Sequence, residues 1–143
     1  MMMALRRSSA AGVLLSQAVA RRVGLNSSDM ECLDLILIDG PASAGEIGRR
    51  TGLTSGAVTG LIDRLEGKGL VERVADPRDR RKVLVRARPD KLARIAAMFE
   101  PLAAAMTDLM SRYTREQLQT IAEFTERSAD AALARVTELN REP

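Results

Sequence analysis

The fold of this 143-residue chain is decided by GEIGRRTGLTSGAVTGLIDRLEGKGLVERVADPRDRRKVLV, residues Gly45–Val85. Its first half predicts two helices that are separated by a short turn around Gly52. Glycine readily adopts the left-handed conformation that ends a helix, and either Thr54 or Ser55 can cap the helix that follows. Two helices joined in this way predict a helix-turn-helix.

The second of these helices carries its apolar residues on one side. Val58, Leu61, Ile62 and Leu65 have the spacing of a buried helical face. We expect the opposite face and the helix start to contact DNA, through Thr54, Ser55, Gly56, Ala57, Thr59, Gly60, Asp63 and Arg64. Small side chains let the helix backbone approach DNA closely, and Arg64 could form a bidentate contact with guanine or phosphate. A solvated helix face is the alternative, but each exposed glycine costs about 1 kcal/mol relative to alanine.

The second half of the stretch predicts a β-hairpin with a highly charged turn. Strands are expected near 70–75 and 82–87, and the turn carries the residues that we expect to bind DNA: Arg78, Asp79, Arg80, Arg81 and Lys82. A hairpin beside a recognition helix is a wing, and the narrow minor groove of DNA attracts guanidinium groups. Asp79 could pair with a neighbouring arginine and hold it extended. A solvated charged loop is the alternative.

Residues Gly45–Val85 strongly resemble the winged helix-turn-helix of MarR-type transcriptional regulators, and the run from Asp63 to Arg81, DRLEGKGLVERVADPRDRR, carries the most specific part of the match. The resemblance implies a two-fold homodimer that grips a pseudo-palindromic operator in double-stranded DNA. It also implies that Arg81 enters the minor groove and that Asp79 orients it. A small aromatic or amphipathic effector is implied as a further partner, bound between the two lobes.

Two departures from the family pattern lie beside these motifs. Arg86-Ala87-Arg88-Pro89 replaces a Leu-Thr that caps the next helix, so we expect this helix to start through Pro89 and Asp90 and the adjoining pocket to be reshaped. Gly60 stands where a larger polar side chain is common, which weakens the case for direct base readout at that position.

The flanking segments are predicted to be helical, so the expected fold is mainly α with one small β-hairpin. Three capping boxes, each a hydroxyl residue followed three positions later by Glu or Gln, are expected to start helices: Ser28…Glu31, Ser43…Glu46 and Thr114…Gln117. Thr120…Glu123 has the same spacing but lies inside a helical stripe. The expected helices are near 4–23, 28–38, 43–51, 54–68, 90–112 and 115–140.

The terminal helices carry more apolar surface than a small central lobe can cover, which predicts a helical homodimer. We expect the dimer contacts to include Leu15, Val19, Leu118, Ile121, Leu133 and Val136. Packing of these helices within one chain is the alternative. We therefore expect a single MarR-like domain over 1–143, with a DNA-binding lobe at 28–88 and a dimerisation lobe formed by 1–27 and 89–143.

The composition excludes most catalytic chemistry. There is no histidine and a single cysteine, Cys32, so His-based acid–base schemes and Cys/His metal sites are absent from the sequence. We find no credible pair of nucleophile and base, and we expect no enzyme activity, cofactor or metal. Cys32 lies among apolar neighbours, which predicts a buried structural thiol, with redox sensing as the alternative.

We expect a cytoplasmic protein, because a lone cysteine fits a reducing compartment and the apolar segments are too short for a signal core or a membrane span. Residues 43–88 hold eleven Lys and Arg against six Asp and Glu, the pattern of a nucleic-acid-binding lobe. Arg6-Arg7 ahead of a six-residue apolar run imitates a secretory signal, but such signals need about 7–15 apolar residues and a membrane span about 18. Export remains the alternative, and we expect no membrane partner.

The sequence thus predicts a cytoplasmic, homodimeric, effector-responsive DNA-binding regulator, and a repressor rather than an activator. The rival hypothesis is a helical dimerisation or adaptor protein whose winged helix binds protein instead of DNA. Salt dependence separates the two, because contacts to phosphates release counterions whereas an apolar protein interface shows little salt dependence.

Overall fold

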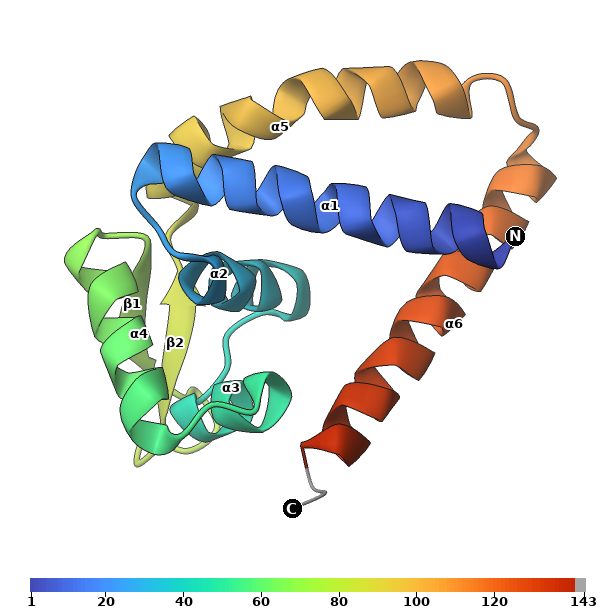
Figure 1. Cartoon of the computed structure of the whole chain (residues 1–143). Coiled ribbons are helices and arrows are strands. Elements are labelled where there is room, and N and C mark those ends of the chain that lie inside the picture. Colours follow the sequence, from blue (N-terminus) through green and yellow to red (C-terminus); the bar gives the residue numbers. More distant parts are fainter. Residues whose placement is uncertain (141–143) are drawn as a thin grey trace. The chain divides into compact units, whose positions relative to one another are not determined.

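The computed structural model of the chain describes residues 1–140, which form two compact units (Figure 1). The N-terminal unit comprises Met1–Ile95, and the C-terminal unit begins at Ala96. The elements in chain order are α1 (Met2–Val23), α2 (Ser27–Asp39), α3 (Ala44–Thr51), α4 (Ser55–Gly67), β1 (Val71–Ala75), β2 (Val83–Ala87), α5 (Pro89–Met110) and α6 (Arg115–Leu139). The expected mainly α fold with one β-hairpin is confirmed.

The core of the N-terminal unit lies where α2, α3 and α4 meet the hairpin. The four apolar residues that the sequence assigned to the inner face of α4 are all buried, as predicted: Val58, Leu61, Ile62 and Leu65. They share this core with buried residues of α2 such as Met30 and Leu33, and with Val71 and Val85 of the hairpin. Burial of these side chains fixes which face of α4 points outward.

The hairpin is a two-stranded sheet, and one isolated β-bridge adjoins it. β1 and β2 pair antiparallel, with Glu72 opposite Arg86 in their register. On the other side of β2, Ala42 forms an isolated bridge with Val85, whose amide donates to the Ala42 carbonyl at 2.8 Å. This bridge, which the sequence analysis did not predict, ties the chain just before α3 to the wing.

The helix ends follow local capping chemistry. Gly52 has the predicted left-handed conformation, with φ 71°, and Thr54 caps α4. The predicted capping boxes of Ser43 and Thr114 are confirmed.

The predicted start of α2 at Ser28 is wrong. Asn26 is the N-cap of α2, and its side-chain Oδ1 accepts a hydrogen bond from the Asp29 amide at 2.7 Å. Asparagine caps helices as well as serine does, so α2 begins at Ser27 and Ser28 lies within the helix.

The first helix belongs to the N-terminal unit. α1 lies beside α2 (Figure 1), and its residues Val19 and Ala20 are buried. Val19 is only 4% exposed, so it packs inside its own chain, and the contact predicted for it with a second protomer stays a prediction. The assignment of 1–27 to a dimerisation lobe stays a prediction; within the single chain, the last turns of α1 pack against α2.

The C-terminal unit contains little buried surface. The last helix of the chain, α6, has no buried residue, and none of residues 96–140 is buried. At its beginning in the N-terminal unit, α5 starts at Pro89, as predicted from the Arg86–Pro89 departure. Within residues 1–140, no helix is both long enough and apolar enough to span a membrane.

Candidate nucleic-acid interface

The start of α4 presents small side chains on an open surface. Ser55, Gly56 and Thr59 are exposed, as is Ala57, while Gly60 is partly exposed. A Cβ atom added to Gly56 would have no neighbouring atom within 4 Å. This part of α4 therefore has the shape needed for close approach of a helix backbone to DNA.

Arg64 does not point freely outward from α4. Its Nη2 donates to Oδ1 of Asp29 at 2.7 Å, and its Nε lies 3.2 Å from both carboxylate oxygens. The Asp29 side chain is 3% exposed and the Arg64 side chain 49% exposed. This contact raises the pKa of Arg64, first through the hydrogen bond to Asp29. The guanidinium fork that the sequence assigned to DNA is thus occupied by the protein, and its DNA contact stays a prediction.

Asp29 is a site residue that the sequence analysis missed. It occupies the same side of α2 as the buried residues Leu33 and Ile36, at positions i, i+4 and i+7. A carboxylate within an apolar stripe was the available signal, because a buried charge needs a partner.

Asp63 is also held by an ion pair within the chain. Its Oδ1 lies 2.5 Å from Nη2 of Arg73 in β1, and Arg73 pairs with Glu66 as well. These contacts join α4 to the first strand of the wing. The DNA role predicted for Asp63 stays a prediction, and the structure shows it bridging two elements.

The charged turn of the hairpin is organised by two aspartates. The Asp79 carboxylate accepts from the backbone amide of Arg81 at 3.1 Å and from its Nε at 3.4 Å, which confirms the predicted pairing of Asp79 with a neighbouring arginine. Asp76 likewise accepts from the Arg78 amide at 2.8 Å. The Arg81 side chain remains 93% exposed, so the turn holds this cation outward.

The remaining cations of the turn carry no such partner. Among residues 1–140, Arg78, Arg80 and Lys82 have no carboxylate oxygen within 4.0 Å. Figure 1 shows this turn and the start of α4 at the same end of the N-terminal unit. The predicted recognition helix therefore begins at the end of this unit where the wing has its charged turn.

The residues predicted for dimer contacts lie in different environments. Leu15 in α1 and Leu118 in α6 are partly exposed, whereas Val19 is buried. The other three predicted contacts are exposed on α6: Ile121, Leu133 and Val136.

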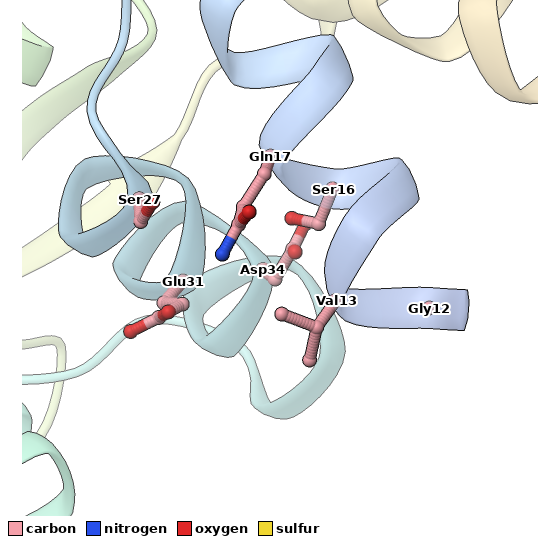
Figure 2. Close-up of a pocket in the computed structure, with 7 residues that line it drawn as sticks. All are labelled: Gly12, Val13, Ser16, Gln17, Ser27, Glu31 and Asp34. Atoms are coloured by element: carbon pink, nitrogen blue, oxygen red, sulfur yellow. The ribbon is translucent and has the colours of Figure 1, made fainter. Parts of the chain in front are cut away.

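A pocket of about 250 Å³ opens between α1 and α2 (Figure 2). Val13, Ser16 and Gln17 line it from α1, and Glu31 and Asp34 from α2. Burial raises the pKa of the Asp34 carboxyl, and the nearby charge of Glu31 raises it further. Its lining thus combines negative charge with small polar and apolar groups and contains no cation.

Cys32 is fully buried, as predicted. Burial, with a smaller contribution from the charge of Asp29, raises the pKa of its thiol to about 11. The thiolate, which is the reactive form, is therefore scarce at neutral pH. The described residues also contain no group of three or more His, Cys, Asp or Glu side chains placed to hold a metal ion.

A helix-turn-helix followed by a two-stranded wing defines the winged-helix class of DNA-binding proteins. The model of the MarR family matches residues 25–83. YcgE of Bacillus subtilis, an uncharacterized HTH-type transcriptional regulator, is 42% identical over 118 residues, covering 82% of this chain and 77% of YcgE. This chain belongs to the MarR family, and it is a DNA-binding transcriptional regulator rather than an enzyme.

Solved structures agree with this fold. The transcriptional regulator Tm0710 of Thermotoga maritima superposes with a TM-score of 0.63 at 23% identity, covering 95% of this chain and 96% of Tm0710. BpsR of Bordetella bronchiseptica, whose DNA binding is regulated by 6-hydroxynicotinic acid, gives a TM-score of 0.51 at 25% identity, covering 91% of this chain and 93% of BpsR.

Proposed function

We propose that this regulator binds a pseudo-palindromic operator as a homodimer and represses transcription there. The observation that carries the proposal is the position of the exposed small residues at the start of α4 and of the charged turn of the wing at the same end of the N-terminal unit. The backbone of α4 can enter a major groove while Arg81, extended by Asp79, reaches a neighbouring minor groove. Arg78, Arg80 and Lys82 supply phosphate contacts beside it.

A homodimer is supported by the exposed apolar residues of α6. Ile121, Leu133 and Val136 recur along one stripe of this helix and are exposed in the single chain. A second copy of the chain would cover such a stripe, and paired protomers would present two recognition helices. DNA binding by a protein of this family also favours a cytoplasmic location.

An effector is supported by the pocket between α1 and α2 and by the regulation of BpsR by a small molecule. Glu31 and Asp34 would repel an aromatic carboxylate. Of the small aromatic or amphipathic molecules that the sequence suggested, the pocket therefore favours an amphipathic one with a neutral or cationic polar group. Such a ligand can shift DNA binding only by its difference in affinity for two conformations of the dimer.

The wing assignment is tested by replacing Arg80 and Arg81 together with alanine. Each lost groove or phosphate contact costs about 1–3 kcal/mol, so operator binding should weaken by several kcal/mol. Both side chains lie on the exposed turn, so the unfolding temperature should stay unchanged. Binding is measured by fluorescence anisotropy at several salt concentrations, on an operator obtained by selection from genomic DNA fragments.

The matched control replaces Arg112 and Arg127, two exposed arginines of the C-terminal unit, with alanine. This control removes the same net charge and should bind the operator as the wild type does. Unchanged affinity of the wing variant at moderate salt contradicts the wing assignment. A wild-type affinity for DNA that barely depends on salt would support the rival hypothesis of a protein-binding adaptor.

A further inference from the structure

The Arg64–Asp29 pair connects the outer face of the recognition helix with the interior of the N-terminal unit. Asp29 belongs to the first turn of α2 and Arg64 to the last turn of α4. Three donor–acceptor contacts of 2.7–3.2 Å link the two side chains, and both oxygens of the carboxylate take part. Arg64 therefore meets Asp29 with the side of its guanidinium group, as in a bidentate ion pair.

Asp29 is much more buried than Arg64. This difference decides whether the guanidinium group of Arg64 can leave Asp29 for a DNA phosphate. The carboxylate of Asp29 is almost completely buried, and within residues 1–140 no other cation lies within 4.0 Å of it. If Arg64 moved to a DNA phosphate, it would leave an uncompensated charge in the core, which is strongly destabilising. Arg64 itself is half exposed and would find water or phosphate without difficulty.

We propose that Asp29 is a positioning residue that sets DNA specificity by holding the guanidinium group of Arg64 on the protein. The proposal rests on the proposed DNA-binding function. With Arg64 withheld, α4 meets DNA with the small residues Ser55, Gly56 and Thr59, and the wing supplies cations beside it. A long cation released on α4 would add affinity for any DNA sequence, because phosphate contacts carry no sequence information.

The test releases Arg64 and counts the phosphates that the protein neutralises. Asp29→Leu removes every acceptor while suiting the apolar surroundings, and binding is measured against salt for the operator and for a scrambled duplex. One additional phosphate contact should steepen the slope of log K against log salt by about 0.9. Affinity for the scrambled duplex should rise about fivefold or more, so the preference for the operator should fall.

A second variant removes both charges of the pair, so that no unpaired charge is left, and tests whether Arg64 contacts DNA in the wild type. Asp29→Asn combined with Arg64→Gln keeps two amides that can hydrogen-bond to each other, so the fold should survive, as thermal unfolding will report. If Arg64 does not touch DNA in the wild type, this double variant keeps the wild-type salt slope and operator preference. If the pair had a purely structural role, both variants would change the stability of the protein, and neither would change the salt slope of DNA binding.

The outcomes separate the two proposals. Loss of about 0.9 from the slope in the double variant would show that Arg64 binds phosphate in the wild type, and it would overturn the inference. A folded Asp29→Leu protein with unchanged slope and operator preference would overturn it too. Wild-type protein that binds neither duplex in a salt-dependent way would instead contradict the proposed function itself.

Discussion

Asp29 and Cys32 lie three residues apart in α2, and both are buried. The neighbouring cation favours the charged carboxylate of Asp29, whereas the surroundings of Cys32 disfavour a charged thiolate. Asp29 has a cationic partner in Arg64. Cys32 is buried near the negative charge of Asp29, and both effects raise the pKa of its thiol. Burial thus strengthens the ion pair of Asp29 with Arg64, whereas the same burial makes Cys32 a poor redox sensor.

The raised pKa of Cys32 predicts a loss of stability in alkali. The folded state keeps the thiol proton to about pH 11, whereas the unfolded chain releases it near 9.0. The stabilisation is complete below pH 9 and is lost as the pH rises toward 11. Between pH 8 and pH 10.5, the free energy of unfolding should therefore fall more in the wild type than in Cys32→Ala. Urea titrations measure this difference, and an equal fall in both proteins would contradict the assignment.

Single residues show what periodicity can and cannot predict. The spacing of Val58, Leu61 and Ile62 was enough to predict burial, because helical geometry alone places them on one face. The partner of Asp29 could not be predicted in this way, since Arg64 is 35 residues away and meets it only after α2 and α4 have packed. The sequence consequently assigned the guanidinium of Arg64 to DNA.

At the scale of the elements, local chemistry predicted boundaries well. The caps at Ser43, Thr54 and Thr114 depend on neighbouring residues only, and the helices that they start were predicted to within one residue. The bridge between Ala42 and Val85 joins residues far apart in the chain and has no local pattern, so it was missed. Contacts between residues that are distant in the sequence cannot be predicted from the identities of neighbouring residues.

The start of α4 gives a prediction in which stability and DNA binding change in opposite directions. Gly56→Ala places a methyl group in open space, so helix propensity should stabilise the fold by up to about 1 kcal/mol. If the backbone at Gly56 approaches DNA closely, the same methyl group should weaken operator binding by tenfold or more, about 1.4 kcal/mol. Thermal unfolding and anisotropy measure the two effects.

Gly67→Ala is the matched control for this variant. Gly67 is the last residue of α4, and a Cβ atom there would also meet nothing within 4 Å. The control should bind the operator as tightly as the wild type because it lies at the opposite end of the helix. Equal operator affinities for Gly56→Ala and wild type would show that this part of α4 stays away from DNA.

For the whole molecule, the decisive property is the apolar stripe that α6 leaves uncovered. Leu133 is 52% exposed in the single chain. If a second protomer covers it, Leu133→Asp buries an unpaired carboxylate and should abolish the dimer and lower the unfolding temperature. Sedimentation velocity measures the assembly. Ala131→Asp, two residues away and on the other side of the helix, is the control and should stay dimeric; a folded wild-type monomer would refute the proposal.

Dimerisation also fixes the spacing of the DNA site. Two recognition helices related by a two-fold axis can enter successive major grooves on one face of DNA only if they are about 34 Å apart. The preferred operator should therefore be an inverted repeat with half-site centres about 10–11 base pairs apart. Each half-site would meet one α4 and one wing, because the start of α4 and the turn of the wing lie at the same end of the N-terminal unit.

Insertion of about five base pairs between the half-sites tests this coupling, because it turns one half-site to the opposite face of the duplex. A rigid dimer can then engage only one half-site, so affinity should fall toward that for the scrambled duplex, and footprinting should show one protected half-site. Insertion of about ten base pairs restores the face but doubles the separation, so tight binding should not return. Equal affinity for the original and altered spacings, with protection of one half-site by one protomer, would contradict binding by a coupled dimer.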